Sequence, residues 1–359
     1  MSEHTFIGLD VHARSVAAGV LGGESGEVRS SSAPAHTAEL VSWLRAQGES
    51  ISVAYEAGPT GFGLARACAA AQIPCLVAAP SRIARAPGDR VKTDRRDALR
   101  LAKLLRLDEL VAVRVPSLAE EAARDLVRAR EDARGDLMRA RHRLSKLLLR
   151  RGLLWEGSAW TQAHERWLHA QSFEERGLTI AYEEAVAAVE SVRARRDALD
   201  AAIAEEATLE PWATTVGRLA CLRGVSTLTA FGLAAEIGDW QRFDGRSIGA
   251  YLGLTPSESS SGERRRQGAI TKAGNGHARR LLVEAAWQQR RPASRPSREL
   301  ARRREGQPAA VRVRAEAAGR RLHHRWQSFD RRGKRSTVAA VAVARELAGW
   351  CWSLAVMED

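Results

Sequence analysis

The sequence predicts an α/β domain at the N-terminus followed by a largely helical chain, and three observations lead to this prediction. Over residues 1–115 short apolar runs alternate with alanine- and leucine-rich stretches, as strands and helices do in an α/β sheet. From Ser117 apolar residues recur every three or four positions, which indicates long amphipathic helices. After Pro211 glycines separate short helical stretches. We therefore expect three domains, at residues 1–115, 116–210 and 211–359: α/β, a helical arm, and a mostly α domain.

The first domain is predicted from apolar runs, two of which end on an acid. Thr5–Asp10 is a strand ending at its aspartate, and Ile51–Tyr55 is a strand followed directly by Glu56. The run Val16–Leu21 is expected to be the hairpin partner of the first strand. The other expected elements are helices at Thr37–Gln47 and Phe62–Ala71 and a buried strand at Cys75–Ala79.

The central domain is predicted to be an arm of two long helices. Apolar residues from Leu118 to Leu147 form one seam of a helix of about 30 residues, and a second helix is expected over Ala181–Ala207. Such a pair indicates an antiparallel coiled-coil arm or a dimerisation device. The segment between them is less regular and carries tryptophans, for which packing is favoured over stacking on bases: Trp155, Trp160 and Trp167.

The positive charge is concentrated near the C-terminus. The chain of 359 residues has a formal net charge of +13, and the block Gly262–Arg335 alone holds 22 Lys or Arg against 6 Asp or Glu. An arginine-rich block of this kind is suited to the phosphates of nucleic acid. A solvated helix face, an acidic protein partner and an anionic membrane surface are the alternatives, of which the membrane is the weakest.

The remaining composition favours a cytoplasmic protein with no membrane span. The four cysteines are widely spaced with no CxxC pair, so a zinc ribbon or a disulfide framework is not expected. The N-terminus lacks the basic and apolar regions of a signal peptide. The apolar stretch Val338–Met357 contains Arg345 and Glu346 in its middle, so we expect a buried helix and not a membrane span.

Four carboxylates are candidates for a metal centre. Asp10 and Glu56 end two strands, and the ends of neighbouring parallel strands meet at one edge of a sheet. Asp94 and Asp97 are three residues apart at a predicted helix start and share one helix face. Converging carboxylates repel unless cations neutralise them, and oxygen ligands suit Mg²⁺ or Mn²⁺. A pair of such ions is a common device for displacement at a phosphodiester. Each acid taken singly could instead be a strand or helix cap.

These acids and several sequence blocks resemble the insertion-sequence 110 family of DEDD transposases. The blocks are GLDVHARSVAAGVL, AYEAGPTGFGLAR and GDRVKTDRRDALRLAKLL near the N-terminus, and the stretch from LACLRGVSTLTAFG to AITKAGNGHARRLLVEAA near the C-terminus. The resemblance implies a RuvC-like domain with the ribonuclease H fold over residues 1–115, a coiled-coil arm, and a C-terminal transposase domain. It implies that the acid tetrad is Asp10, Glu56, Asp94 and Asp97.

The resemblance also implies a serine nucleophile in a motif ending Ser-Ser-Gly. Ser260 takes this place, with Ser259 and Ser261 as alternatives one position away, and without the resemblance the stretch is a plain flexible loop. Neighbouring polar residues are candidates for phosphate contacts, either at the reacting phosphate or along the backbone: Arg264, Arg265, Arg266, Lys272, Asn275, Arg279 and Arg280. The stretch Leu222–Gly238 resembles a helix-hairpin-helix that offers backbone amides to phosphate, but a core helical hairpin is an equal alternative, because Val225-Ser226 follows Gly224 where the family often has a second glycine.

The resemblance therefore implies a transposase that cleaves and rejoins DNA strands with a divalent metal and a phosphoserine intermediate. It also implies a structured guide RNA, double-stranded DNA at the element ends and target, and a dimer or tetramer. Two further classes stay open from the residues alone. A structure-selective nuclease would need the tetrad but not Ser260, and a non-catalytic adaptor would need neither.

Overall fold

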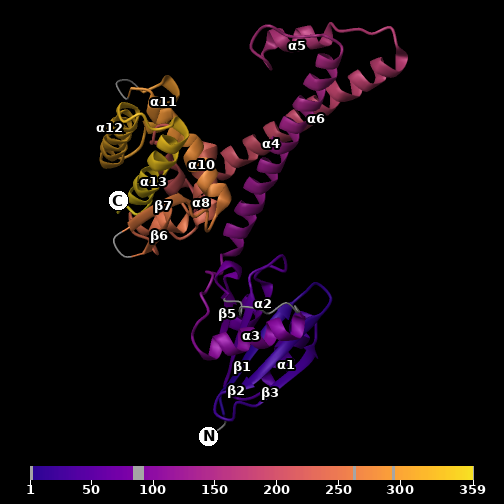
Figure 1. Cartoon of the computed structure of the whole chain (residues 1–359), viewed down its shortest axis with the longest axis vertical. Coiled ribbons are helices and arrows are strands. Elements are labelled where there is room, and N and C mark those ends of the chain that lie inside the picture. Colours follow the sequence, from indigo (N-terminus) through magenta and orange to yellow (C-terminus); the bar gives the residue numbers. More distant parts are fainter. Residues whose placement is uncertain (1–2, 84–92, 262–263, 293–295, 359) are drawn as a thin grey trace. The chain divides into compact units, whose positions relative to one another are not determined.

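The computed structural model describes residues 3–83, 93–261, 264–292 and 296–358. The chain divides into two compact units, Met1–Ser117 and Leu118–Asp359, which are described separately (Figure 1). The first unit is mixed α/β and the second is largely helical. The predicted α/β class with a helical remainder is confirmed.

A five-stranded sheet forms the centre of the first unit. Its strand order is β3-β2-β1-β4-β5, with β1, β2 and β3 antiparallel to one another in turn, and β4 and β5 parallel to β1. The strands are β1 (Thr5–Val11), β2 (Val16–Gly22), β3 (Val28–Ala33), β4 (Ile51–Glu56) and β5 (Cys75–Ala78). The edge strand β3 was not expected from the sequence, because its serine-rich, exposed residues carry no apolar pattern and pair with β2 through the backbone.

Helices cover both faces of this sheet. Ile7 and Leu9 of β1 pack with Leu40 and Leu64 in the core on one face, which α1 (Thr37–Arg45) and α2 (Gly63–Ala70) cover. Successive strand residues point to opposite faces, so Gly8 and Asp10 belong to the other face. That face receives α3 (Asp94–Arg106), and η1 (Pro80–Arg82) follows β5.

Two glycines set the approach of α3 to the sheet. A Cβ atom on Gly8 would lie 2.0 Å from the carbonyl oxygen of Ala98, and one on Gly19 would lie 2.5 Å from the Cα atom of Leu99. Such distances are far below van der Waals contact, so any side chain here would displace the helix. The backbone of α3 therefore lies directly on β1 and β2, which places the first turn of α3 beside the end of β1.

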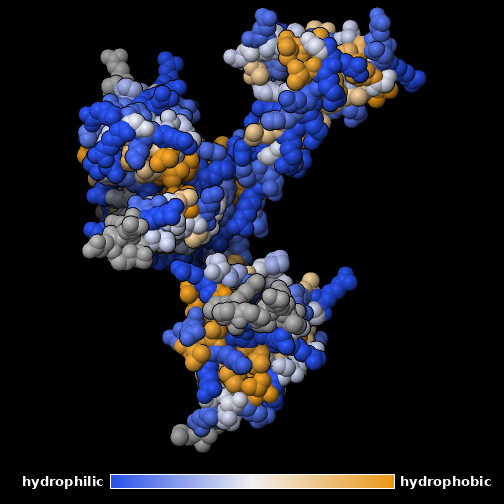
Figure 2. Space-filling view, in the orientation of Figure 1, coloured by the Kyte–Doolittle hydropathy of each residue, from blue (hydrophilic) through white to orange (hydrophobic). Residues whose placement is uncertain are grey.

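The second unit begins with two long helices and a short helix between them. α4 (Leu118–Arg150) and α6 (Arg176–Glu206) are antiparallel, because Arg130 near the start of α4 pairs with Asp200 near the end of α6 at 2.6 Å. Figure 2 shows mostly hydrophilic side chains along this pair and apolar side chains among them at the α5 end. The joining segment contains α5 (Gln162–His169), which the sequence did not predict.

The tryptophans of the joining segment pack together, as favoured from the sequence. The rings of Trp155 and Trp167 lie 5.6 Å apart, and His164 stacks on Trp167 at the same distance. The guanidinium of Arg141 lies 4.5 Å from the centre of the Trp160 ring. These rings close the end of the core between α4 and α6, which also contains Leu144, Leu148, Leu168 and Tyr182.

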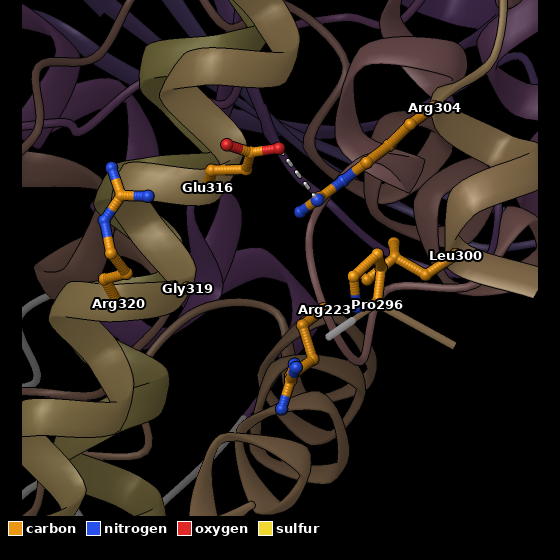
Figure 3. A pocket seen from close by; sticks show the side chains of 7 residues that line it. All are labelled: Arg223, Pro296, Leu300, Arg304, Glu316, Gly319 and Arg320. Carbon is orange, nitrogen blue, oxygen red and sulfur yellow. Dashed lines mark ion pairs between the residues drawn. The ribbon is translucent and has the colours of Figure 1, made fainter. Parts of the chain in front are cut away.

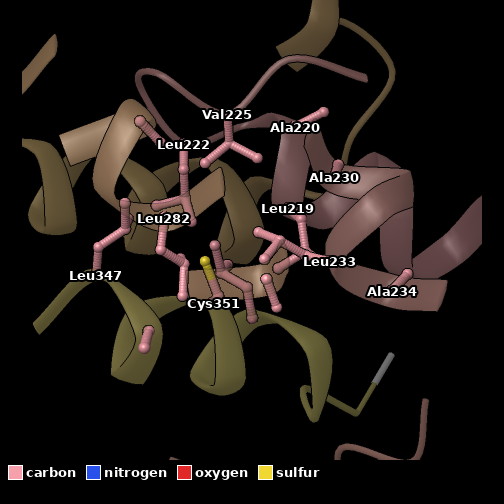
Figure 4. Packing of buried hydrophobic residues seen from close by; sticks show 14 of the residues in the cluster. Leu219, Ala220, Leu222, Val225, Ala230, Leu233, Ala234, Leu282, Leu347 and Cys351 are labelled. Carbon is pink, nitrogen blue, oxygen red and sulfur yellow. The ribbon is translucent and has the colours of Figure 1, made fainter. Parts of the chain in front are cut away.

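The rest of the second unit surrounds one large apolar core. α8 (Thr227–Ile237), α10 (Gly276–Ala286), α12 (Ala309–Arg331) and α13 (Ser336–Ala355) contribute most of it. Figure 4 shows Leu347 and Cys351 of α13 meeting Leu219, Leu233 and Leu282 in this core. The other elements are α7 (Ala213–Ala220), α9 (Ser247–Tyr251), β6 (Pro256–Ser261), β7 (Arg264–Ile270), η2 (Trp287–Arg290) and α11 (Arg298–Arg304).

Within the described residues one helix, α13, is long and apolar enough by length and composition to cross a membrane. Its apolar side is already covered, because Val343, Leu347, Cys351 and Leu354 are at most 1% exposed in the core. A core helix of a folded protein meets the same criterion, so the apolar composition of α13 follows from its packing against the other helices.

Candidate metal and strand-transfer sites

Asp10 and Glu56 lie side by side at one edge of the sheet. β1 and β4 are parallel and their last paired residues are Leu9 and Tyr55, so Asp10 and Glu56 are the next residue on each strand. Both acids line a small pocket of about 80 Å³ together with Asp97 of α3. Three of the four predicted carboxylates therefore share one pocket in the first unit.

The first turn of α3 supplies the other two acids. Thr93 caps this helix, its side chain accepting a hydrogen bond from the backbone N–H of Arg96, so the helix begins at Asp94. Asp97 lies one turn into the helix and faces the pocket, with Nη1 of Arg100 3.8 Å from its Oδ1. The close approach at Gly8 and Gly19 brings this turn next to Asp10.

A histidine that the sequence analysis did not single out joins this group. Nε2 of His12 lies 3.4 Å from Oδ1 of Asp10 and 3.7 Å from Oδ2 of Asp94. One possible ligand atom from each of Asp10, His12 and Asp94 falls within 4.8 Å of the others. The signal in the sequence was the spacing Asp-x-His at a strand end, which places both side chains on the same side.

The donor set of this pocket fits a divalent cation. Carboxylate oxygens from Asp10, Glu56, Asp94 and Asp97 are the ligands that Mg²⁺ and Mn²⁺ favour, and the imidazole of His12 adds a softer nitrogen. Carboxylates this close repel one another, and a cation bound among them would relieve that repulsion. Among the described residues, Nη1 of Arg100 lies 3.8 Å from Oδ1 of Asp97. The pocket can therefore hold a metal, with Asp10 as the acid common to the small pocket and the histidine cluster.

Ser260 lies in a β-hairpin of the second unit. β6 and β7 are antiparallel, with Ser260 paired to Arg265 and Ser259 to Arg266. Ser259, Ser260 and Ser261, which composition alone would assign to a loop, are strand residues whose backbone pairing continues through Ser261. The side chains of residues 260–265 lie outside the described part of the structure, so the candidate nucleophile and the Arg264 and Arg265 guanidinium groups are placed only by their backbone.

The turn that follows the hairpin is held by the polar residues predicted near it. Lys272 and Gly274 have φ values of 54° and 65°, and a Cβ on Gly274 would lie 1.9 Å from the carbonyl oxygen of Tyr251. Nη1 of Arg279 donates to the carbonyl oxygens of Leu252 and Ala273, each at 2.9 Å. Arg279 therefore links this turn to the end of α9.

Two more of the predicted phosphate contacts are engaged within the protein. Asn275 caps α10, accepting from the backbone N–H of Ala278 at 2.9 Å. Arg280 forms ion pairs with Glu131 of α4 and Glu284 of α10. Among the predicted cations whose side chains are described, Arg266 and Lys272 are exposed.

A buried glutamate connects this turn to α4, and the sequence analysis also missed it. The Glu236 side chain is 1% exposed, and its carboxylate accepts hydrogen bonds from Asn275 at 2.6 Å and from Arg128 at 3.1 and 3.2 Å. Nδ1 of His277 lies 3.0 Å from the same carboxylate. Burial acts to raise the pKa of Glu236, but these hydrogen bonds from His277, Arg128 and Asn275 outweigh it and lower the pKa to about 2.

The α7–α8 connection is a packed helical hairpin, which was one of the two alternatives from the sequence. Gly224 has a φ of 80°, and a Cβ there would lie 2.3 Å from the carbonyl oxygen of Ala285. Val225 is fully buried, and the side chain of Ser226 caps α8. The close contact with α10 explains why residue 224 is a glycine.

Both units of the chain match known transposases. Residues 7–151 match the family DEDD_Tnp_IS110, described as a transposase, and residues 217–301 match the transposase IS116/IS110/IS902 family. The chain is 42% identical over 360 residues to the putative transposase y4qE of Sinorhizobium fredii, covering 98% of this chain and 89% of that protein. It is 32% identical over 344 residues to the transposase for insertion sequence element IS1533 of Leptospira borgpetersenii, covering 93% and 99%.

The chain belongs to the IS110 family of transposases. The resemblance noted in the sequence is thereby confirmed, and the protein is a transposase enzyme. The first matched segment contains all four acids and His12, and the second contains Ser260 and the turn after it. Each of the two groups of candidate residues therefore lies within one of the two segments that match the family.

Proposed function

We propose that this transposase cleaves and rejoins DNA strands, using a divalent metal held by Asp10, Glu56, Asp94 and Asp97 and the hydroxyl of Ser260 as nucleophile. The observation that carries the proposal is the pocket shared by Asp10, Glu56 and Asp97, with Asp94 beside Asp10 through His12. The bound metal, Mg²⁺ or Mn²⁺ as one or two ions, would supply Lewis-acid stabilisation of charge on the phosphate.

The strand order supports assigning the first unit to the RuvC-like, ribonuclease H-type fold. In the order β3-β2-β1-β4-β5, three strands are antiparallel in sequence and β4 and β5 are parallel to β1, so the ends of β1 and β4 lie together at the acid pocket. We further propose that α4 and α6 form a coiled-coil arm, and that residues 211–359 are the C-terminal transposase domain. The leucine core between α4 and α6 supports the coiled-coil assignment.

The chemical step is a phosphoryl transfer to serine. The oxygen of Ser260 forms a bond to the scissile phosphorus, the bond from phosphorus to the leaving sugar oxygen breaks, and a phosphoserine diester results. The serine hydroxyl loses a proton and the released 3′ or 5′ sugar oxygen gains one. Rejoining reverses this with an incoming sugar hydroxyl. Arg264, Arg265, Arg266 and Lys272 are proposed to hold the phosphates near the serine.

The partners follow from the same proposal. Double-stranded DNA at the element ends and at the target is the substrate, and a structured guide RNA selects them, which the basic block at 262–335 supports by its charge. A dimer or tetramer is also proposed, as the family resemblance implies. The protein would act in the cytoplasm.

The test is trapping of a covalent adduct on labelled element-end DNA with Mg²⁺ and the flanking RNA. Wild-type protein should give a protein–DNA adduct that mass spectrometry maps to Ser260, and Ser260→Ala should give none. Ser257→Ala on the same strand is the matched control, and the single changes at Ser259 and Ser261 test the neighbouring positions. Asp10→Asn should abolish adduct formation, whereas Asp108→Asn, an exposed acid outside the pocket, should not.

One observation favours a second candidate function, a metal-dependent, structure-selective nuclease. The described residues that line the acid pocket all belong to the first unit, and three of the four candidate acids are among them. A nuclease of this kind would still cut DNA as Ser260→Ala and would form no adduct. Retained cleavage by that variant would replace the serine mechanism with this one.

A further inference from the structure

Two adjoining hollows lie beside the turn between α7 and α8, away from the serine hairpin. The first, of about 370 Å³, is lined by Arg223, Arg304 and Arg320 with Glu316 (Figure 3). The second, of about 400 Å³, is lined by Arg223 again and by Arg291 and Arg303 with Glu299. Arg223 and Leu300 belong to both. Together the two hollows and their five arginines form the arginine pocket.

Three of the five arginines, Arg223, Arg303 and Arg304, are held by hydrogen bonds from the guanidinium to backbone carbonyl oxygens. Nε of Arg303 donates to the carbonyl oxygen of Ala220 at 3.1 Å, and Nε of Arg304 donates to that of Cys221 at 3.0 Å, at the end of α7. Nη1 of Arg223 donates to the carbonyl oxygens of Arg291 and Pro292. A guanidinium held this way still has further N–H donors, so the pocket carries preorganised donors.

The positive charge of the arginine pocket is only partly balanced. Glu316 lies 3.5 Å from Arg304, and Glu299 lies 3.4 Å from Arg303 with a side chain that is 82% exposed, which makes the second pair weak. Among the described residues that line the two hollows, five are arginines and two are glutamates. Burial lowers the pKa of Arg223, and the nearby positive charges of Arg304 and Arg291 lower it further. An anion in the pocket would relieve this crowding of like charges.

The arginine pocket also has free space at Gly319 of α12, where the side chain of another residue could have filled it. A Cβ atom on Gly319, within α12, would find no atom within 4 Å. Glycine inside a helix is less favourable than alanine by about 1 kcal/mol, so this opening is not explained by the stability of α12. The absent side chain leaves the space next to Arg320 open (Figure 3).

We propose that the arginine pocket binds a backbone phosphate of nucleic acid at a site separate from the strand-transfer chemistry. The described residues that line it come from the α7–α8 turn, from residues 288–304 and from α12. Guanidinium groups that converge from different elements suit the several oxygens of a phosphate. The pocket is a holding site, which fixes the register of a bound strand without reading its bases. The choice of nucleic acid over a small phosphorylated compound rests on the proposed function.

The test measures binding of full-length protein to labelled duplex DNA and, separately, to a labelled RNA hairpin by fluorescence anisotropy at several salt concentrations. Arg320→Gln is expected to weaken binding of at least one of them about tenfold and to reduce its salt slope by about one. Gly319→Leu keeps every charge and fills the pocket, so it should weaken the same ligand. Arg195→Gln, the same loss of charge at an exposed site on α6, should change the Kd by less than about twofold.

The outcomes separate the pocket from its alternatives. Equal losses for Arg195→Gln and Arg320→Gln would mean a diffuse positive field and would overturn the pocket, as would wild-type binding by both Arg320→Gln and Gly319→Leu. If nucleic acid binding is unchanged but pyrophosphate raises the melting temperature of wild type and not of Arg320→Gln, the ligand is a small phosphate compound and the proposal fails. The adduct assay on wild type is independent, so absence of strand transfer would refute the proposed function and leave a pocket-specific binding loss standing.

Discussion

Acid should destabilise the second unit through one buried carboxylate, Glu236. This side chain is 1% exposed and is held by Arg128, Asn275 and His277, which hold its pKa at about 2 against a usual value of 4.5. The folded-state pKa is the lower one, so the carboxylate stabilises the folded state at any pH above 4.5. That stabilisation is lost as the pH falls through 4.5 towards 2.

The size of the effect follows from the same shift. A fall in pKa from 4.5 to about 2 corresponds to about 3 kcal/mol of free energy of unfolding at neutral pH, of which about 2 kcal/mol is gone at pH 3. Replacing Glu236 by glutamine removes this titration. Arg128 is 56% exposed and can be solvated when its partner is lost, so we expect a loss of about 3 kcal/mol at pH 7, the size of the pKa effect itself.

Urea unfolding followed by tryptophan fluorescence at pH values from 7 to 3 measures this. Nine of the ten tryptophans lie in the second unit, so the signal reports that unit. The stability difference between wild type and Glu236→Gln should shrink by about 2 kcal/mol between pH 6 and pH 3. Glu284→Gln, which removes an exposed acid paired with Arg280, is the matched control and should keep a constant difference. Parallel pH curves for wild type and Glu236→Gln would refute the reasoning.

Three further predictions concern packing and the metal pocket. Gly8→Ala places a Cβ 2.0 Å from the carbonyl oxygen of Ala98, so it should lower the urea midpoint of the first unit by an amount equivalent to about 3 kcal/mol; an unchanged midpoint measured by circular dichroism would contradict the close approach. Leu144→Ala, at a site 1% exposed between α4 and α6, should lower the free energy of unfolding measured by calorimetry by about 2 to 5 kcal/mol. Met138→Ala, at an exposed site on the same helix, is the control and should lower it far less. His12→Ala should weaken Mn²⁺ binding by about tenfold in titration calorimetry while Asp10→Asn abolishes it, and equal affinity in His12→Ala would exclude the imidazole as a ligand.

The elements with a clear apolar period were predictable from the sequence, and the others were not. The strands at Thr5–Val11 and Ile51–Glu56 and the helix Leu118–Arg150 follow directly from their apolar residues. β3 and the β6–β7 hairpin were not predicted, because their strands consist largely of serine and arginine residues. Backbone hydrogen bonds pair these strands, and a polar sequence neither indicates nor prevents such pairing. Strand pairing at an exposed edge depends on the neighbouring strand, which a local pattern does not contain.

The site shows the same division between local and tertiary information. The positions of the four acids at the ends of strands and at the start of a helix were visible in the sequence. That all four bind one metal stays a prediction, which belongs to the proposed function. His12 and Glu236 were missed for different reasons. His12 lies two residues beyond Asp10, a spacing that could have been recognised. The role of Glu236 comes from partners as far away as Arg128, 108 residues along the chain, and nothing near it in the sequence signals burial of its charge.

The packing of α3 explains how carboxylates that repel can share one pocket before any cation arrives. The repulsion among Asp10, Glu56 and Asp97 acts to push α3 away from the sheet. The approach at Gly8 and Gly19 opposes it, because it brings the helix backbone into direct contact with β1 and β2 and buries Ala98 and the neighbouring apolar residues. The two glycines therefore stabilise the arrangement of acids on which the proposed metal site depends, although neither could be a ligand. Acids in this pocket should consequently tolerate exchange for neutral residues with a gain in stability, even where activity is lost, as is general for sites in which function requires like charges to be held together.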